Sequence, residues 1–592
     1  MSEDTKVHDH EINKNGFWET ETTRGHVYDK TLSEYLKNFF TEQSVYDFGC
    51  GPGEYTKHFV DNGIEAVGYD GNPNTPKLSN GLCKVADLTE QHNFGKRDWV
   101  MSLEVAEHIP KEGEKAYIEN LIKHCNKGIV LSWALPGQPG DGHINCQSNE
   151  YVITLMEKHG LLLDSNVSNQ LREASTEWWF KNTLMCFRRI DSMPKITFCI
   201  PSKNNRRYLE ACIPSIRKNA YRDDHDIIVF VDADNDGTVE WLDSVKDEYN
   251  LKYIVNDTDG LYGIGKAYDK CVEESETDIF MIFHADMMLG KNADLEAFKY
   301  LDKNKVVCAT RIEPPLHPEN GEKIIKDFGM WPERDVEEGW LEEDFDKYVE
   351  EAKITNQFKF TNGCFAPWMM YKDVFLGMGG HDPRFASARE DSDVFNRLVL
   401  SGFELIQSWQ SFVYHLTARG GQFQHGKLTQ DHKQKSEEWQ KLMQNSTREF
   451  IRKWGTNVSH NNLLMPLIAP KFDVTFVLKD FTFDFINALE PWCSKLYIDD
   501  ENIRKAYISS ENDNTTCDLN KKIQIDSGEY EGSVIVEFSC NDMDEAGWQF
   551  IMNLPLILND SGQVGEMEYG QFNLTIKDLT DKKEELIKCH MI

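Results

Sequence analysis

Two stretches of the sequence each begin a βαβ unit, and together they constrain the fold more than any other feature. Both combine a short apolar run, a polar or glycine-rich turn and a helical pattern: SVYDFGCGPGEYTKHF at 44–59 and MPKITFCIPSKNNRRYLEACIPSI at 193–216. Strand, turn and helix in this order are typical of α/β domains. The sequence therefore predicts two successive Rossmann-like α/β domains.

A third domain is predicted after these two. The polar run RRIDSMPK separates the first two domains, and we place their boundary near Asp191, which assigns 1–190 to one and 194–460 to the other. Beyond KWG the helical pattern fades, and period-two alternation follows in FDVTFVL, FTFDFI, SVIVEFSC and FNLTIKDL. Such alternation between Asp, Asn and Gly clusters is typical of half-buried strands. We expect a small, mostly β domain over 461–592, with no catalytic pattern of its own.

Composition narrows the classes of function. The 592 residues include 99 Asp and Glu against 64 Lys and Arg, a formal net charge of -35. Nucleic-acid affinity comes largely from basic side chains, so this charge argues against a nucleic-acid partner. No window approaches the roughly 18 apolar residues of a membrane span, and the start MSEDTKVHDH lacks a targeting pattern, which predicts a cytoplasmic protein. The 14 cysteines are scattered without a CxxC pair, as expected for reduced core thiols.

Chemistry-bearing residues in the first domain begin at a glycine turn. DFGCGPG, at 47–53, follows a β-rich pair and opens a helix, and its glycines let the backbone turn sharply and approach a ligand. The next strand, IEAVGYD, ends at Asp70, 17 residues after Gly53, where a carboxylate would meet the hydroxyls of a ribose held over the turn. VADLTE, with Asp87, and DWVMSLEVAEHIP, with Glu104, follow.

In this series of motifs, residues 40–190 resemble class I methyltransferases that use S-adenosylmethionine. The resemblance implies that the glycine turn packs on the methionine part of the cofactor, that Asp70 binds the ribose, and that Asp87 lies by the adenine. Glu104 matches a position that lines the cofactor pocket. The cofactor-binding residues implied in this way are Asp47, Gly49, Gly51, Gly53, Asp70, Asp87 and Glu104.

A dinucleotide-binding domain is the alternative for the same stretch. It would require GxGxxG, whereas the sequence has GCGPGE, with Glu54 where the pyrophosphate-binding helix should begin. A negative side chain there repels phosphate but tolerates the positive sulfonium and amino groups of S-adenosylmethionine. Charge therefore favours the methyl donor.

The methyl acceptor is less constrained by the sequence. Methyltransferases that modify amino groups of bases carry a [DN]PP[YF] tetrad after the fourth strand, and the SLEV found here argues against base methylation. Downstream, the loop WALPGQPGDGHINCQSNEYV contains His143, which could take a proton from an acceptor hydroxyl. The alternative is a loop histidine that bonds only to the backbone.

Acidic residues follow the strands of the second domain. DIIVFVDADNDG ends in Asp232, Asp234 and Asp236, more acids than a turn needs for capping. The glycine-rich helical stretch GLYGIGKAYDKC then precedes the apolar run DIFMIFHADMM. This order resembles glycosyltransferase family 2, the GT-A type enzymes that use nucleotide-diphosphate sugars, over about 194–455.

The resemblance also implies a divalent metal, Mn²⁺ or Mg²⁺. In that family the strand corresponding to DIFMIFHAD ends in a DxD-like motif whose last acid, here Asp286, binds the metal that bridges the donor phosphates. His284 replaces the first acid, a departure from the family pattern, although imidazole can also ligate manganese. His415, in VYHLTARGG, matches a third metal ligand of several relatives. The alternatives are an ordinary polar residue at a strand end for Asp286 and a structural histidine for His415.

Paired acids complete the resemblance. REDSDVFNRL places Glu390 and Asp391 at the start of a helix, where the family has acids near the acceptor, and by resemblance Asp391 is the base of an inverting displacement. Helix capping is the alternative, and it explains one acid but not a run of three. Residues 311–360 are longer and more acidic than the fold requires, and we expect them to form the acceptor wall. The residues matched to the nucleotide sugar are Pro201, Asp232, Asp234, Gly265, Lys266 and His284.

Three functions of different classes remain open. The first is a bifunctional enzyme that extends a glycan acceptor by one sugar and O-methylates a sugar hydroxyl. The second is a glycosyltransferase with a structural, inactive methyltransferase domain, against which the complete glycine and aspartate series argues. The third is a non-catalytic glycan-binding scaffold, against which Asp286 and the Glu390–Asp391 pair argue. Such fusions resemble glycan-building enzymes of large DNA viruses, of phages and of bacterial polysaccharide biosynthesis loci.

Overall fold

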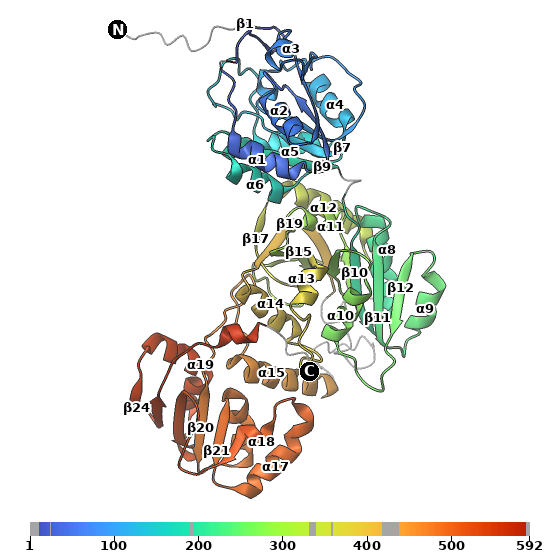
Figure 1. Cartoon of the computed structure of the whole chain (residues 1–592). Helices are drawn as coiled ribbons and strands as arrows, with labels where there is room; N and C mark the ends of the chain where they lie inside the picture. The colour runs from blue at the N-terminus through green and yellow to red at the C-terminus, as the bar shows by residue number, and fades with distance from the viewer. Residues whose placement is uncertain are drawn as a thin grey trace. The chain divides into compact units, whose positions relative to one another are not determined.

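The chain folds into two compact units, Met1–Pro194 and Lys195–Ile592, as seen in a computed structural model (Figure 1). The structure describes residues 11–23, 25–189, 193–330, 339–356, 359–416 and 437–587. The boundary predicted near Asp191 falls outside the described residues. Among those described, no helix has the length and apolar character needed to span a bilayer.

The first unit is built around a seven-stranded sheet of order β5-β4-β3-β6-β7-β9-β8. Its strands are β3 (Ser44–Phe48), β4 (Glu65–Asp70), β5 (Lys84–Val85), β6 (Arg97–Ser102), β7 (Cys125–Leu131), β8 (Leu161–Leu163) and β9 (Met185–Arg189). Strands β3 to β7 pair in parallel, and β9 is antiparallel to both of its neighbours. The chain runs outward from β3 to β5 and returns on the other side at β6. This doubly wound sheet is the predicted fold, and ligands bind at the carboxyl ends of strands where the order reverses.

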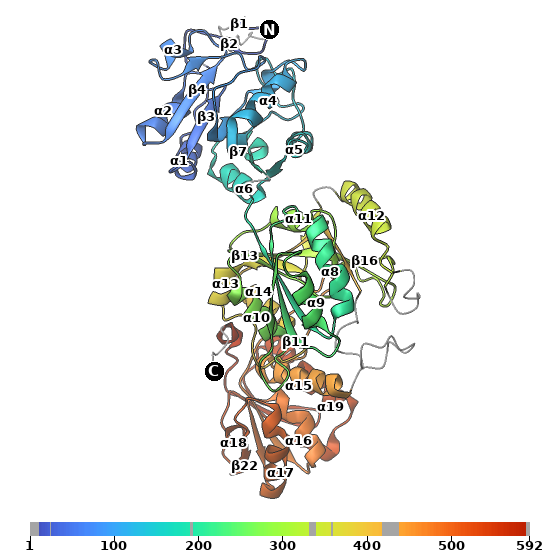
Figure 2. The ribbon, with the colours of Figure 1, turned by 90° about the vertical axis from the view of Figure 1, so that its right-hand side faces the viewer.

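Helices cover both faces of this sheet. Figure 2 shows α1 (Lys30–Phe39) and α2 (Glu54–Asp61) on one side of the strands, and α4 (Glu114–His124) and α5 (Asn149–Glu157) on the other. Four of the five residues of β3 are buried, because a parallel sheet covered on both faces has no solvent side. The glycine turn after β3 is thereby fixed at the end of a rigid strand.

The second unit contains a ten-stranded sheet whose main path is β12-β11-β10-β13-β18-β15-β19-β14. The strands of this path are β10 (Thr197–Lys203), β11 (Asp226–Ala233), β12 (Leu251–Val255), β13 (Ile279–Ile282), β14 (Met287–Leu289), β15 (Lys305–Glu313), β18 (Trp368–Tyr371) and β19 (Glu404–His415). The first four strands of the path are parallel, with helices α8 (Arg206–Asn219), α9 (Thr238–Val245) and α10 (Ile264–Glu274) between them in sequence. The predicted βαβ start is therefore confirmed.

The run DIFMIFHADMM divides between two strands of this sheet. β13 ends at Ile282, the chain turns through His284 and Asp286, and β14 begins at Met287. The two methionines are fully buried, and Met287 pairs with His415 of the antiparallel strand β19. The predicted single strand ending on Asp286 is thus two strands joined by a turn, and the sheet itself brings His415 beside that turn.

A separate six-stranded sheet, of order β22-β21-β20-β23-β25-β24, forms the C-terminal part of the second unit. The predicted sheet is present, in strands β20 (Val474–Lys479), β21 (Lys495–Ile498), β22 (Ile523–Ile525), β23 (Val534–Ser539), β24 (Gly565–Tyr569) and β25 (Phe572–Ile576). Helices add to it: α17 (Glu501–Glu511) and α18 (Leu519–Lys522) lie on one side and α19 (Glu545–Ser561) on the other (Figure 1). FTFDFI was predicted as a strand, which is wrong, because Thr482 caps helix α16 (Phe483–Leu489) within it.

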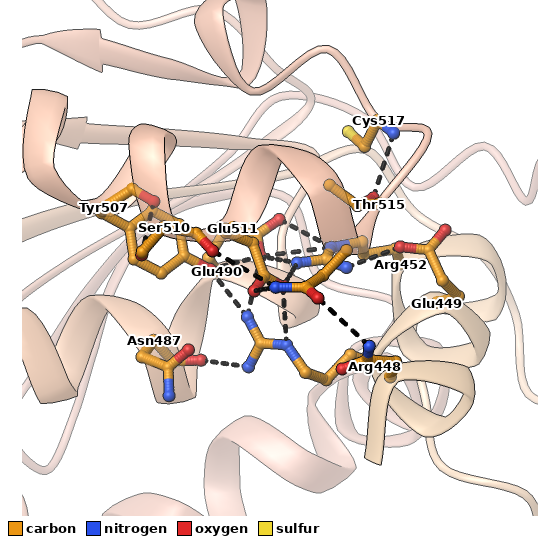
Figure 3. A network of polar contacts seen from close by, with 12 residues as sticks. Arg448, Glu449, Arg452, Asn487, Glu490, Tyr507, Ser510, Glu511, Thr515 and Cys517 are labelled. Atoms are coloured by element: carbon orange, nitrogen blue, oxygen red, sulfur yellow. Dashed lines mark hydrogen bonds and ion pairs between the residues drawn. The ribbon is translucent and has the colours of Figure 1, made fainter. Parts of the chain in front are cut away.

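Buried ion pairs join this C-terminal part to helix α15 (Glu437–Trp454) (Figure 3). Arg452 donates to Glu490 at 2.5 Å and to Glu511 at 2.6 Å, and Arg448 donates to Glu511 at 2.9 Å. Glu490 is fully buried, and Lys522 and Arg452 hold the pKa of its carboxyl well below the usual range despite that burial. Removing one partner of these ion pairs would leave an uncompensated buried charge. The pairs therefore tie α15 to the C-terminal part.

The cysteines follow the prediction made from their spacing. Every cysteine in the described residues is a free thiol, and most are buried, as Cys199 and Cys271 are in the core of the second unit. Burial raises the pKa of the Cys199 thiol well above its usual range. These side chains therefore act as small apolar core residues.

Candidate active sites

A cavity of about 480 Å³ opens at the carboxyl ends of the strands in the first unit. Six of the seven cofactor-binding residues predicted from the sequence line it, and so does the predicted acceptor residue His143. The lining residues among those predicted are Asp47, Gly49, Gly51, Asp70, Asp87, Glu104 and His143. Gly53 lies outside the lining and directly precedes α2.

The glycine turn and Asp70 form one hydrogen-bonded assembly. Gly49 and Gly51 have φ of 80° and 52°, in the left-handed region that glycine adopts without strain. The amide of Gly49 donates to the carbonyl of Tyr69 at 2.7 Å, and the amide of Gly51 donates to the Asp70 carboxylate at 2.8 Å. The same carboxylate accepts from the amide of Asn72, which fixes its orientation at the end of β4.

Several buried carboxyl groups give this cavity a negative environment. Burial raises the pKa of Asp47 to about 7, and the Asp47 carboxylate accepts a hydrogen bond from Thr56 at 2.7 Å. Burial also raises the pKa of Asp70 and Glu104. A ligand with positive charge would relieve the cost of ionising these groups, whereas a diphosphate would increase it. The residues therefore fit S-adenosylmethionine, with its sulfonium and ammonium groups.

His143 lies at the end of the cavity formed by the loops after β6 and β7. Its Nδ1 is 3.2 Å from the carbonyl oxygen of Gln138, so Nδ1–H donates and Nε2 carries the lone pair. Nε2 is 3.9 Å from a carboxyl oxygen of Glu107, and burial lowers the pKa of the imidazole. Glu107 and the neighbouring His108 were not predicted as site residues, although both lie in the segment LEVAEHIP with Glu104.

A second cavity, of about 580 Å³, lies in the second unit. Five residues predicted from the sequence line it together: Pro201, Asp232, His284, Glu390 and Asp391. Its lining also includes Met443 of α15 and, from a later loop, Val458 and His460. No motif pointed to these wall residues, because the chain reaches the cavity again only after a long stretch of sequence.

His284, Asp286 and His415 meet beside this cavity. One potential ligand atom from each lies within 4.8 Å of the others, and His415 Nε2 is 3.8 Å from the Asp286 carboxylate. His415 Nδ1 lies 2.8 Å from Glu313, which directs Nε2 toward Asp286. Burial lowers the pKa of His284 to about 4, so this imidazole is neutral and available as a ligand. The three side chains fit a divalent cation.

Behind His415, Glu313 belongs to a buried ion network. Arg311 and Lys323 each donate to the Glu313 carboxylate at 2.9 Å, and all three side chains are almost fully buried. Together with His415 they hold the pKa of Glu313 well below its usual range. The first residues of the predicted acceptor wall, 311–313, are thus part of strand β15 and support the metal ligands. Of that wall, 331–338 and 357–358 lie outside the described residues.

The paired acids begin helix α14 (Glu390–Leu400). Ala388 and Arg389 precede them with φ of 67° and 72°, a left-handed conformation that costs a non-glycine residue about 1–3 kcal/mol. Among the residues that the structure describes, Asp391 accepts only a local hydrogen bond, from the amide of Ser392, and one oxygen of Glu390 is buried without a partner. Strained backbone that presents two acids to a cavity is typical of a functional site.

The third acid of this run has a structural role. Asp393 is fully buried, accepts from Arg397 at 2.8 Å and from Trp454 at 2.9 Å, and pairs with Lys453 at 2.5 Å. It therefore joins α14 to α15. Helix α15 is in turn attached to the C-terminal part, so that part supports the helix that carries Glu390 and Asp391.

The other residues predicted to bind the nucleotide sugar either support the cavity or lie on the protein surface. Asp232 accepts from the amide of Tyr262 at 2.8 Å and so holds the loop at the cavity rim. Asp234 is exposed, lies outside the lining and accepts from the amide of Thr238 at 2.7 Å at the start of α9. Gly265 packs closely under His381, and Lys266 is exposed on α10, both outside the lining.

Tyr268 is a cavity residue that no sequence motif indicated. Its hydroxyl is buried without a hydrogen-bond partner, and its ring stacks near those of His284 and His381 at 6.4 and 5.8 Å. Burial and the carboxylates of Glu390 and Asp286 raise its pKa well above the usual range, so it remains a hydroxyl donor. Helical periodicity marks Tyr268 only as an inward-facing residue of α10.

Comparison with known proteins assigns both domains. Residues 20–193 match the family model of a methyltransferase domain, and residues 197–374 match glycosyl transferase family 2. A 108-residue stretch is 31% identical to the abequosyltransferase RfbV of Salmonella typhimurium, and it covers 18% of this chain and 32% of that protein.

Two solved structures are similar to parts of the chain. One is magnesium protoporphyrin IX methyltransferase (ChlM) from Synechocystis PCC 6803 with bound SAH, at 17% identity and a TM-score of 0.22 over 26% of this chain and 81% of that one. The other is the mannosyltransferase PcManGT from Pyrobaculum calidifontis in complex with GDP-Man and Mn²⁺, at 17% identity and a TM-score of 0.27 over 38% of this chain and 56% of that one.

Proposed function

We propose that this chain, which carries a methyltransferase domain and a glycosyltransferase family 2 domain, transfers a sugar from a nucleotide-sugar donor to a glycan and O-methylates a sugar hydroxyl. The observation that carries the proposal is the second cavity, where the Glu390–Asp391 pair faces His284 of the Asp286 cluster. The stretch similar to an abequosyltransferase supports a sugar as the transferred group.

The donor diphosphate belongs beside the Asp286 cluster. A divalent cation would be held by His284, Asp286 and His415 and would offset the charge of the two phosphates as they leave. Asp232 holds the rim of the cavity where the nucleoside would enter, through its bond to the amide of Tyr262. Glu313 keeps His415 in the required orientation.

The acceptor hydroxyl is activated by Asp391. Of the two paired acids, Glu390 is the unsuitable base, because burial and the charge of Asp391 raise its pKa to about 8 and keep it protonated near neutrality. Asp391 lies in the first turn of α14, where the helix dipole favours a carboxylate. The Asp391 carboxylate takes the hydroxyl proton while the acceptor oxygen attacks the anomeric carbon, so the configuration of that carbon inverts.

The raised pKa of Glu390 predicts a pH dependence. Below about pH 8 Glu390 is neutral, and above it a second buried negative charge forms beside Asp391 and disfavours the donor diphosphate. Because this pKa lies above the ordinary value of 4.5, the unit also loses stability as the pH rises toward 8. We expect sugar transfer to fall as the pH rises through about 8 in the parent chain.

The matched variant Glu390→Gln carries no ionisable group at this position and should keep its activity through the same pH range. The measurement is the rate of nucleoside diphosphate release from pH 6 to about 9 in both chains. An equal alkaline fall in the parent chain and in Glu390→Gln would contradict this role of Glu390.

Methyl transfer belongs to the cavity of the first unit. S-adenosylmethionine bound there supplies an electrophilic methyl group on a positively charged sulfur. Asp70 would accept from the ribose hydroxyls of the cofactor, and the buried acids around Asp47 would offset its positive charge. His143 presents Nε2 at the acceptor end, where a sugar hydroxyl must lose its proton.

Replacing Asp70 by Ala tests the cofactor assignment. The change removes the carboxylate that orients the Gly51 amide and would bind the ribose, so the affinity for S-adenosylmethionine should fall by about 1–3 kcal/mol. Titration calorimetry of the full chain measures this difference. Asp61→Ala, at an exposed ion pair of α2, is the control and should bind like the parent chain. An absence of binding heat in the parent chain would contradict the assignment.

The donor assignment is tested with a panel of nucleotide sugars and Mn²⁺. The full chain should release nucleoside diphosphate from one donor of the panel, which mass spectrometry detects without knowledge of the acceptor. If no donor is hydrolysed and none binds, the sugar-transfer half of the proposal fails.

A further inference from the structure

The acceptor end of the first cavity contains a second cluster of potential metal ligands. One ligand atom each from Glu107, His108 and His143 lies within 4.8 Å of the others. The cluster belongs to the first unit, separate from the His284, Asp286 and His415 cluster of the second unit. Both histidines line the cavity that also contains the glycine turn and Asp70.

The carboxyl group of Glu107 is buried in an environment that a cation would stabilise. Its side chain is fully buried, and neither carboxyl oxygen has a hydrogen-bond partner within standard geometry among the described residues. Glu104 stands close to it and also has one buried oxygen without a partner. The other oxygen of Glu104 accepts a hydrogen bond from Gln138, so Glu107 is the carboxyl group left without a donor. Such a group is costly in a protein interior unless a positive charge compensates it.

The two histidines are oriented as metal ligands usually are. His143 Nδ1 lies 3.2 Å from the carbonyl oxygen of Gln138, and His108 Nδ1 lies 3.2 Å from that of Gly142. A backbone carbonyl that accepts from Nδ1–H fixes the tautomer in which Nε2 carries the lone pair. His143 Nε2 is 3.9 Å from Glu107. Ligand atoms around one ion with bonds of about 2.1 Å lie about 3–4 Å apart, so small side-chain rotations would close the site.

We propose that Glu107, His108 and His143 bind a divalent cation that holds two adjacent hydroxyls of the sugar to be methylated. Two imidazoles and one carboxylate suit Mn²⁺, Fe²⁺, Co²⁺ or Zn²⁺ and leave coordination positions open for substrate oxygens. The inference rests on the proposed methylation of a sugar hydroxyl and narrows it to an acceptor with a vicinal diol.

The position of the cluster agrees with this role. Asp70 ends β4 on one side of the switch point, and the cluster follows β6 and β7 on the other. A cofactor whose ribose met Asp70 would lie along the crevice at the switch point, where its methyl group could reach the cluster.

The cation lowers the pKa of the bound hydroxyl. The hydroxyl proton passes to water, and the oxygen attacks the methyl carbon. The new C–O bond forms as the S–CH₃ bond breaks, and the electron pair remains on sulfur. His143 is then a metal ligand and not the proton acceptor.

Mn²⁺ binding to the full chain tests the site, with electron paramagnetic resonance as the readout of free Mn²⁺. The variant Asp286→Ala removes the carboxylate of the cluster in the second unit, so Mn²⁺ still bound to this chain reports on the first unit. We expect one bound Mn²⁺ per Asp286→Ala chain. If this chain binds none, the proposal is overturned without any change near Glu107.

Adding Glu107→Gln to that chain should weaken the remaining site by more than about 100-fold, beyond the 10–100-fold typical of losing an outer-shell partner. Glu112→Gln, an exposed glutamate five residues away, is the matched control and should leave Mn²⁺ binding unchanged. Calorimetric binding of S-adenosylmethionine to the Glu107→Gln chain shows that the unit is folded. Equal Mn²⁺ binding by the two Gln variants overturns the assignment of Glu107.

Methyl transfer distinguishes this inference from the proposed function. If Mn²⁺ binds through Glu107 but no sugar is methylated, the metal site stands and the proposed acceptor fails. If sugars are methylated equally fast with and without a chelator, the proposed function stands and the catalytic role of the cation is overturned.

Discussion

Replacement of Asp391 by Asn is expected to lower the rate of sugar transfer by about two to four orders of magnitude. The amide keeps the shape of the carboxylate but cannot accept the hydroxyl proton. Glu390 cannot substitute for it near neutral pH, because burial and the charge of Asp391 raise the pKa of Glu390 to about 8. Donor affinity should change little, since the groups proposed to hold the diphosphate belong to the Asp286 cluster.

Asp373→Asn is the matched control, because Asp373 forms an exposed ion pair with Lys303 in the same domain. The anomeric configuration of the product, measured by NMR, should be the inverse of that of the donor. Retention of configuration, or an Asp391→Asn chain with nearly the parent rate, would leave Asp391 as a helix cap.

Asp286→Ala is expected to abolish sugar transfer and to leave methyl transfer to a preformed glycan unchanged. Its carboxylate belongs, with His284 and His415, to the only cluster of potential metal ligands found among the described residues of the second unit. Methyl transfer uses a cavity in the other compact unit, with its own cofactor. The two losses should therefore be independent.

Both activities are measured in one preparation, as nucleoside diphosphate and S-adenosylhomocysteine released over time. Asp302→Asn, at an exposed turn of the same domain, is the control variant and should keep both activities. A parallel fall of both activities in Asp286→Ala would show that the two chemistries share residues.

Local sequence patterns were sufficient for much of the fold and for part of each site. Strand, turn and helix in close succession located β3 and β10, because hydrophobic periodicity and glycine act over a few residues. Asp70 was predicted as a site residue for the same reason, since it ends a strand that the pattern marks, whereas Asp391 was predicted from the resemblance to glycosyltransferase family 2. The prediction of a strand for FTFDFI was wrong because alternation over six residues also fits a short helix that buries Ile486 and Leu489.

These local patterns could not predict contacts between segments that lie far apart in the sequence. The bond between Glu313 and His415 joins two strands 102 residues apart, and nothing in either segment indicates the other. The same holds for the cavity wall formed by Met443 and His460, and for the role of Asp393, which becomes clear only where Lys453 and Trp454 meet it. Such groupings depend on sheet order and helix packing.

The most direct measurement is mass spectrometry of one glycan acceptor incubated with the full chain, a nucleotide sugar, Mn²⁺ and S-adenosylmethionine with a deuterated methyl group. Two transferase activities in one chain predict a product that carries both the added sugar and the labelled methyl group, with no added sugar in the Asp286→Ala reaction. A glycan that gains neither group, in a preparation that releases no nucleoside diphosphate from any donor, would contradict the account.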